Sequence, residues 1–303
     1  MPQFHPKPFF NPYIYVTQKQ IMDEPISISK VPTTKPSFIQ APTPVVAPTS
    51  KPTFATEIID LPSEGYFYPV NSPLSSGRIE IKFMTAREED ILSSQNLIKK
   101  GIVLDELLKA LIVNPDIKLD DILVGDKNAI FIAARRLAYG DAYPVKIKCP
   151  ECSAESNINV NLSELKNRPF DFTGFTKGNN SFEFVLPISK KKVTYRLMTH
   201  RDEQAIDAEL KSLARLNKDA ASPEMTTRLK YMIVAIDGND DRAIIKKAVD
   251  DMLSRDSSEL RKHVRSNNPD IDMTFNFVCP KCGHEERMGV PVGVDFFWPN
   301  SGI

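Results

Sequence analysis

Segments in which polar and apolar side chains alternate are separated by segments in which apolar side chains recur at helical spacing. In the first half, residues 78–83 alternate strictly, which predicts a half-buried strand. The period then changes, and Thr85 with Glu88 fits a capping box, so a helix is predicted from there to Lys99. Two more helices are predicted, over 104–111, where four leucines recur at helical spacing, and over 126–140, with Asp126 as the expected cap.

The second half of the chain repeats this order. Residues 182–186 and 193–197 predict a β-hairpin, and Met198-Thr199-His200-Arg201 follows it directly, as Met84-Thr85-Ala86-Arg87 follows the first strand. Helices are predicted after it over 200–217, 223–236, 241–254 and 257–266. The repeated order indicates an internal duplication, although a string of this length also occurs by chance at two helix starts.

Proline is concentrated at the beginning of the chain. Eleven of the 24 prolines lie between Pro2 and Pro52, in a stretch without glycine. Such a segment forms neither a helix nor a central strand, so an extended or disordered arm is predicted over residues 1–55. A leader without a role is the simplest interpretation. Its aromatic residues leave open a second one, in which the arm becomes ordered in a partner's groove.

The four cysteines form two copies of one motif. They are Cys149-Pro150-Glu151-Cys152 and Cys279-Pro280-Lys281-Cys282, and alternating segments on both sides of each pair predict a β-hairpin around it. The C-x-x-C spacing lets two thiolates converge on one ion, so one pair supplies half of a tetrahedral site. We therefore predict one structural Zn²⁺ held by Cys149, Cys152, Cys279 and Cys282, a closed shell without an open position for a substrate.

Other roles for the thiols remain open at this point. A dithiol oxidoreductase would place its C-x-x-C at a strand-to-helix turn, whereas strand patterns lie on both sides of each pair here. His284, which lies close to Cys282, could replace one thiolate, but a solvated turn histidine is the simpler expectation.

Charge and composition narrow the functional classes. The 303 residues carry 39 basic and 39 acidic side chains, which argues against a general binder of nucleic acid or anionic membranes. Basic clusters at 190–192 and 261–265 nevertheless leave open a zinc-ribbon adaptor that binds nucleic acid. No apolar stretch approaches the roughly 18 residues that span a bilayer, and prolines interrupt the start where a signal peptide would be apolar. We expect a soluble protein of a reducing cytoplasm.

Catalytic motifs are missing from the sequence. It contains no G-x-x-x-x-G-K, no H-E-x-x-H and no G-x-S-x-G, and its acidic pairs lie where helix starts and turns favour carboxylates. We therefore expect a protein that is not an enzyme. The predicted fold is α+β, with an arm (1–55) and two similar lobes (56–165 and 166–303). Each lobe has a β-hairpin, a helical bundle and a Cys-bearing hairpin, and the Cys₄ site joins the lobes in a zinc-ribbon-like arrangement.

Several strings then resemble a known family. They are Leu61-Pro62-Ser63 to Tyr68-Pro69, Met84 to Leu92, Lys99-Lys100-Gly101 with Leu104 to Leu108, and Leu123 to Ile130. They are similar to the baseplate hub proteins of T-even-like contractile-tailed bacteriophages, chiefly over residues 60–165.

The resemblance implies a non-enzymatic late protein made in the infected cell's cytoplasm, needed to build the central hub of the tail baseplate. It implies that the partners are other baseplate hub and tail proteins. From the charge, the composition and the missing motifs we expect no membrane partner and no small-molecule substrate, and nucleic acid is disfavoured as a partner. Both persistence in the virion and departure after assembly are compatible with it.

Overall fold

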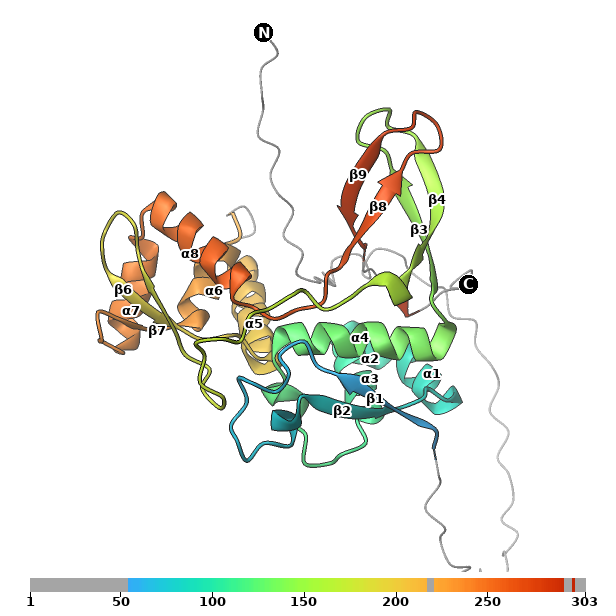
Figure 1. The fold of residues 1–303 in the computed structure, drawn as a ribbon, viewed down its shortest axis with the longest axis horizontal. Helices are drawn as coiled ribbons and strands as arrows, with labels where there is room; N and C mark the ends of the chain where they lie inside the picture. Colours follow the sequence, from blue (N-terminus) through green and yellow to red (C-terminus); the bar gives the residue numbers. More distant parts are fainter. Residues whose placement is uncertain (1–53, 217–220, 292–295, 298–303) are drawn as a thin grey trace, which may run out of the picture.

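A computed structural model describes residues 54–216, 221–291 and 296–297. Helices and small antiparallel sheets alternate along it, which confirms the α+β class (Figure 1). The predicted arm over residues 1–55 lies, except for its last two residues, outside the described part. Among the described residues, no helix is long and apolar enough to cross a membrane.

The first half begins with a hairpin. Strands β1 (Thr56–Asp60) and β2 (Arg78–Lys82) pair antiparallel, which confirms the strand predicted from alternation. The capping box is also present, since the Glu88 carboxylate accepts hydrogen bonds from the Thr85 amide at 2.9 Å and hydroxyl at 2.7 Å. The helix predicted up to Lys99 is wrong in one respect, because it is interrupted at Ser94, whose ψ of 104° is extended. It forms two helices, α1 (Ala86–Ser93) and α2 (Gln95–Lys100).

The helices that follow form the centre of the molecule. Helix α3 (Val103–Leu111) buries Leu107, Leu108 and Leu111 as predicted, and α4 (Val124–Tyr139) runs through the middle of the fold (Figure 1).

The prediction that Asp126 caps α4 is wrong. Leu123 holds the cap position and Asp126 lies one turn further, fully buried. Its carboxylate accepts hydrogen bonds from the Ser63 amide at 2.9 Å, the Ser63 hydroxyl at 2.6 Å and the Tyr68 hydroxyl at 2.7 Å. Burial, the largest cause, raises the pKa of Asp126 to about 6 against these bonds. The residue thus anchors the loop between β1 and β2 to the start of α4.

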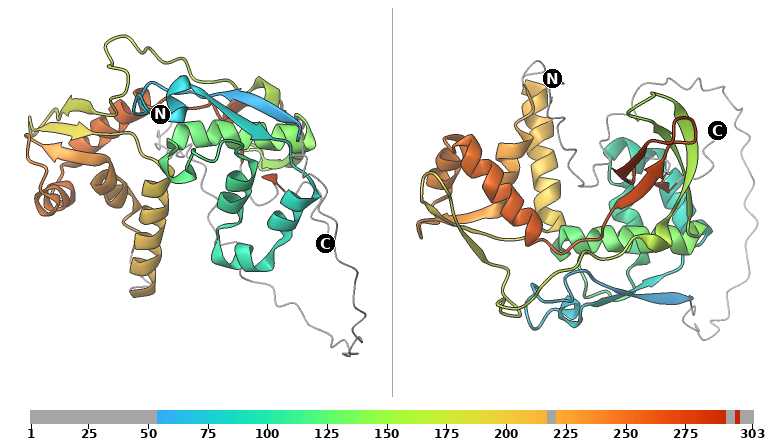
Figure 2. Two further views of the ribbon diagram at one scale, coloured as in Figure 1. Left: turned by 90° about the horizontal axis from the view of Figure 1, so that it is seen from below. Right: turned by 45° about the horizontal axis from the view of Figure 1, so that its top comes forward.

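The second half also begins with a hairpin. Strands β5 (Phe182–Val185) and β6 (Lys192–Tyr195) pair antiparallel as predicted, and α5 (His200–Leu216) follows and extends away from α4 (Figure 2). The remaining helices are α6 (Glu224–Met232), α7 (Arg242–Asp250) and α8 (Ser254–Ser266).

The helix predicted over 223–236 is wrong at its end. Residues Ile233–Ile236 form β7, which pairs with β6 and makes a three-stranded sheet. Three of its four residues are β-branched, and these side chains fit a half-buried sheet better than a last helical turn.

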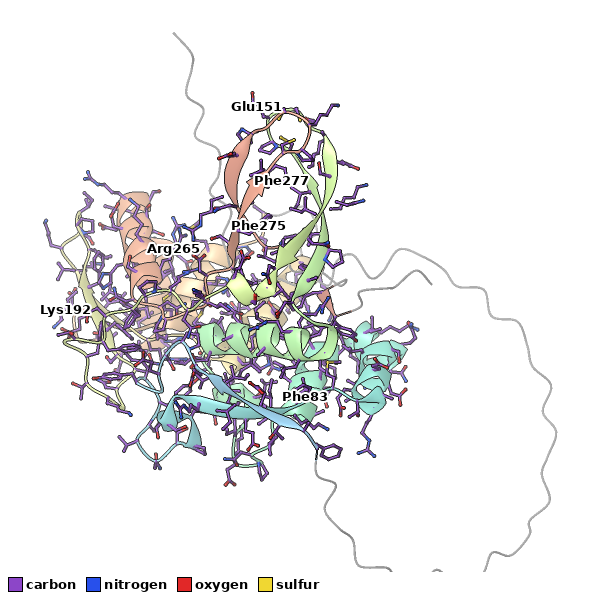
Figure 3. All side chains as sticks on the ribbon, turned by 45° about the vertical axis from the view of Figure 1, so that its right-hand side comes forward. Phe83, Glu151, Lys192, Arg265, Phe275 and Phe277 are labelled. Carbon is purple, nitrogen blue, oxygen red and sulfur yellow. The ribbon has the colours of Figure 1, made fainter. Side chains whose placement is uncertain are left out.

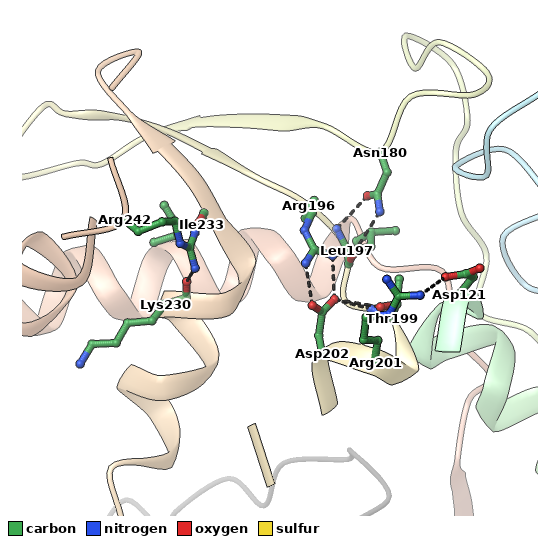
Figure 4. A network of polar contacts seen from close by, with 10 residues as sticks. All are labelled: Asp121, Asn180, Arg196, Leu197, Thr199, Arg201, Asp202, Lys230, Ile233 and Arg242. Atoms are coloured by element: carbon green, nitrogen blue, oxygen red, sulfur yellow. Dashed lines mark hydrogen bonds and ion pairs between the residues drawn. The ribbon is translucent and has the colours of Figure 1, made fainter. Parts of the chain in front are cut away.

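The strand-to-helix junctions of the two halves share one polar arrangement. In the first, Lys82 pairs with Glu88 at 2.8 Å. In the second, Arg196 forms two 2.6 Å bonds with the Asp202 carboxylate, which also accepts the Thr199 amide at 2.9 Å (Figure 4). Both carboxylates therefore bind the cap residue and a cation at or just after the end of the preceding strand. This likeness supports the predicted duplication, while the division into two lobes remains a prediction.

A partly buried charge cluster connects the halves. Lys127 of α4 forms an ion pair with Glu203 of α5, and Nε2 of His200 lies 3.2 Å from a carboxylate oxygen of Asp105 in α3. Burial acts to lower the pKa of His200, but the nearby carboxylates of Asp105 and Glu203 outweigh it and raise the pKa. Backbone bonds at the same interface join Val124 to Met198 at 3.0 Å.

Candidate metal centre

Each Cys pair lies at the tip of a two-stranded hairpin. Strands β3 (Ala142–Lys148) and β4 (Glu155–Asn161) carry the first pair, and β8 (Thr274–Val278) and β9 (Glu285–Gly289) carry the second. Both hairpins are antiparallel, as the alternation predicted. They stand side by side above α4, so their tips meet although they are far apart in the sequence (Figure 1).

The backbone turns at the two tips are alike. The amide of Ser153 donates to the carbonyl of Cys149 at 2.9 Å, and the amide of Gly283 donates to that of Cys279 at the same distance. Ser153 and Gly283 both have a positive φ, of 58° and 72°, which closes each turn. Two copies of one turn therefore present two sulfurs each.

The four sulfurs form one cluster. They all lie within 4.8 Å of one another, with Cys149 to Cys282 at 3.8 Å and Cys152 to Cys279 at 3.7 Å. A tetrahedral ion with metal–sulfur bonds of about 2.3 Å requires sulfurs about 3.8 Å apart. The spacing thus fits a four-coordinate site, and the structure brings all four predicted ligands together. This donor set and geometry could hold a metal ion.

The local backbone favours a thiolate at one position. Hydrogen bonds from the Cys282 amide, the largest cause, and from the Lys281 amide lower the pKa of Cys279 to about 6. The His284 amide acts to lower the pKa of Cys282, but the neighbouring sulfurs raise it to about 12. Cys279 therefore loses its proton easily and Cys282 resists, since a second thiolate beside the first would bring two negative charges together. A bound cation would remove that repulsion.

Apolar packing and backbone pairing hold the hairpins against each other. Phe275 and Phe277 lie on β8, Phe277 being buried to 1% exposure, while Glu151 lies at the tip beside the sulfurs (Figure 3). At the base, the hydroxyl of Tyr143 donates to the carbonyl of Pro291 at 2.8 Å. Below this, the two linkers leading to and from the hairpins pair through Asn167 and Ile271.

The cluster has an enclosed and an open side. Cys149 and Cys279 are 1% and 2% exposed, whereas Cys152 is half-buried and Cys282 is exposed. The β-hairpin setting lacks the helix N-terminus that activates a redox C-x-x-C, because a strand follows each pair. His284 is not part of the sulfur cluster, and its Nε2 lies 3.4 Å from a carboxylate oxygen of Glu286.

One repeated motif shows which residues of the two halves correspond, and the sequence predictions did not use it. The string Asp-Asp-x-Leu-x-x-Asp occurs at 120–126 and again at 250–256, at equal distances before the two Cys pairs. In the structure the last Asp of each string is buried at the start of a helix, Asp126 in α4 and Asp256 in α8. Asp256 accepts the amides of Ile188 and Ser189 at 2.7 and 3.0 Å, as Asp126 accepts that of Ser63.

Comparison with known families adds a sequence-level result. A family model described as T4 bacteriophage base plate protein matches residues 66–298. The matched range includes all four cysteines and both hairpins that carry them. No curated protein and no solved structure shows a significant match to the chain.

Proposed function

The chain belongs to the T4 bacteriophage base plate protein family, as the resemblance predicted, and we propose that it is a non-enzymatic component or assembly factor of the central baseplate hub. A baseplate protein works through contacts with other tail proteins. We place its action in the infected cell's cytoplasm during assembly, and in the tail baseplate if it stays in the virion.

The sulfur cluster carries the mechanistic part of the proposal. Two hairpins from distant parts of the chain present four sulfurs at the spacing of one tetrahedral ion. We propose that the ion is Zn²⁺, which accepts four thiolates in this geometry without redox chemistry. The ligands Cys149, Cys152, Cys279 and Cys282 fill its coordination shell, so the role is structural.

Such an ion would brace the molecule. The first hairpin follows α4, and the second follows α8 near the end of the described chain. Their tips would be joined by the metal and their bases by the paired linkers. This two-point attachment fixes the hairpins relative to α4, which suits a protein that transmits position to its neighbours in an assembly.

The alternative is a zinc-ribbon adaptor for nucleic acid. It uses the same sulfur cluster together with the basic clusters at 190–192 and 261–265. Several of those charges have partners within the chain, since Lys192 pairs with Glu183 at 2.7 Å and Lys262 with Glu259 at 2.7 Å. Binding to duplex or single strands that weakens with salt would favour this alternative.

Co-purification tests the hub assignment. The full chain is co-expressed with the other hub proteins of its phage, with and without residues 1–55, and finished particles are analysed by mass spectrometry. We expect a stable complex with hub proteins, and loss of hub formation when the chain is omitted. Recovery of the chain alone, with hub formation unaffected by its omission, would refute the assignment.

A further inference from the structure

The matching halves differ in the loop that packs on the buried aspartate. In the first half the connection between β1 and β2 spans 61–77, and its Tyr68 is 3% exposed against the start of α4. The Tyr68 hydroxyl donates to Asp126 at 2.7 Å and accepts the amide of Leu123 at 2.9 Å. One tyrosine therefore covers both the buried carboxylate and the cap residue of α4.

The second half lacks this cover. Its loop between β5 and β6 spans only 186–191, and it reaches Asp256 through backbone amides alone. Leu253, the counterpart of Leu123 at the cap of α8, is 51% exposed, whereas Leu123 is 4% exposed. The Leu253 amide has no hydrogen-bond acceptor within the described residues.

A groove lies at this uncovered place. It has a volume of about 280 Å³ and is lined by apolar side chains together with the Asp256 carboxylate. The apolar lining includes Leu186, Ile236, Ile244, Ala248 and Leu253. Two of its lining residues, Leu253 and Asp256, are the second-half counterparts of Leu123 and Asp126, which Tyr68 bonds in the first half.

The charged residues around the groove favour an occupant with negative charge. Lys191 and Lys247 line it, against one exposed carboxylate, Asp251. Burial acts to raise the pKa of Asp256, but its hydrogen bonds with two backbone amides help to lower that pKa below its usual value. This carboxylate therefore already has partners within the chain. An occupant with an acidic residue beside its aromatic ring would complement the lysines. The first-half loop has this composition, because Glu64 precedes the aromatic residues 66–68.

We propose that this groove binds a tyrosine side chain presented by an acidic segment of a partner protein. The ring would pack on Leu253 and Ile244, and the hydroxyl would accept the Leu253 amide and approach Asp256, as Tyr68 does at α4. The inference goes beyond the hub assignment and does not depend on the metal. Its basis is the contrast between a covered and an uncovered copy of one surface.

A peptide taken from the chain itself provides the probe. A capped peptide with the sequence of residues 61–69 is titrated into the full chain, whose isoleucine and methionine methyl groups are isotope-labelled for NMR. We expect saturable shifts at Ile236, Ile244 and Met252. The Tyr68→Phe peptide should bind about three- to tenfold more weakly through loss of one hydrogen bond, and the Tyr68→Ala peptide should not bind.

Variants of the full chain provide the controls. Ile244→Asp, at a residue 48% exposed, should abolish peptide binding without unfolding the protein, and Ala248→Phe should fill the groove. Exposed Leu216, away from the groove on α5, gives the matched control Leu216→Asp, which should bind like the wild type.

Three results would overturn the proposal. The first is the absence of saturable shifts, or equal shifts with the Tyr68→Ala peptide. The second is peptide binding that appears only after Tyr13 and Tyr15 are replaced by serine, which would assign the groove to the chain's own first residues. The third is self-association in analytical ultracentrifugation that Ile244→Asp abolishes, which would assign the groove to a second copy.

Discussion

Replacing one thiol from each hairpin, singly and together, perturbs the sulfur cluster most directly. Cys149 is 1% exposed and Cys282 is exposed. Without metal, Cys149→Ser should therefore lower the free energy of unfolding by about 1–3 kcal/mol, since it buries a hydroxyl among apolar groups. Cys282→Ser should change it by less than about 0.5 kcal/mol, because its side chain is in contact with water.

Bound zinc should change how much stability each of these two variants loses relative to the wild type. An ion that binds only the folded chain adds about 3–4 kcal/mol when its free concentration is 100 to 1,000 times the dissociation constant. Each single variant should lose most of that stabilisation. Both thiols hold the same ion, so the double variant loses the zinc stabilisation only once. In zinc its free energy of unfolding should therefore fall by about 4–7 kcal/mol, about as much as that of Cys149→Ser alone.

Urea unfolding followed by circular dichroism measures these values, under reducing conditions, in buffered zinc and in chelator. Asn157→Ser, on an exposed position of β4, is the matched control and should keep the full zinc effect. Losses of the two single variants that add in the double variant would refute a shared ion. A Cys282→Ser variant that retains the wild-type zinc effect would refute it equally.

Three further perturbations test the packing around the centre. Gly125→Ala would place a methyl group 2.0 Å from the carbonyl oxygen of Pro269, so the linker must move, at a cost of about 2–3 kcal/mol in urea unfolding. Tyr68→Phe removes the hydroxyl bonded to Asp126 and should cost about 1–3 kcal/mol in the same assay. The raised pKa of His200 gives stability that is complete below the unfolded value near 6.5 and lost as pH rises through the folded value. His200→Gln should therefore flatten the decline in melting temperature between about pH 6 and 8.

Control substitutions accompany the glycine and tyrosine variants. Gly289→Ala should be tolerated, because its methyl group would lie 3.9 Å from the nearest atom, the Met273 carbonyl oxygen. Tyr66→Phe, at a half-buried ring, should cost less than Tyr68→Phe. Equal losses within either pair would contradict the packing argument. A pH profile unchanged in His200→Gln would contradict the role given to the charge cluster.

Local pattern predicted most of the secondary structure, and tertiary packing decided the rest. Alternation located the strands around both Cys pairs, because more and less exposed side chains alternate along β3 and β4 and around Phe277 in β8. The prediction failed where a residue's partner is remote in the sequence. Asp126 has the composition of a cap, yet Ser63 and Tyr68 draw it into the interior. Residues 233–236 become a strand because β6 offers an edge, which no local periodicity reveals.

The candidate centre was predictable in its ligands but not in its support. The paired C-x-x-C spacing indicated four converging sulfurs, and the structure places them within 4.8 Å of one another. The backbone pairing of Asn167 with Ile271 carries no side-chain signal, so the sequence could not indicate that the hairpins are joined at their bases. The repeated Asp-Asp-x-Leu-x-x-Asp string was a readable signal for aligning the halves, and through them the uncovered groove.

The metal-edge X-ray absorption spectrum of the full chain, purified under reducing conditions with its metal content measured, tests the shared centre most directly. The account predicts one zinc per chain with four sulfur neighbours at about 2.3 Å and no nitrogen or oxygen in the first shell. A chain that binds no zinc, or an ion with two sulfurs and light-atom neighbours, would contradict it.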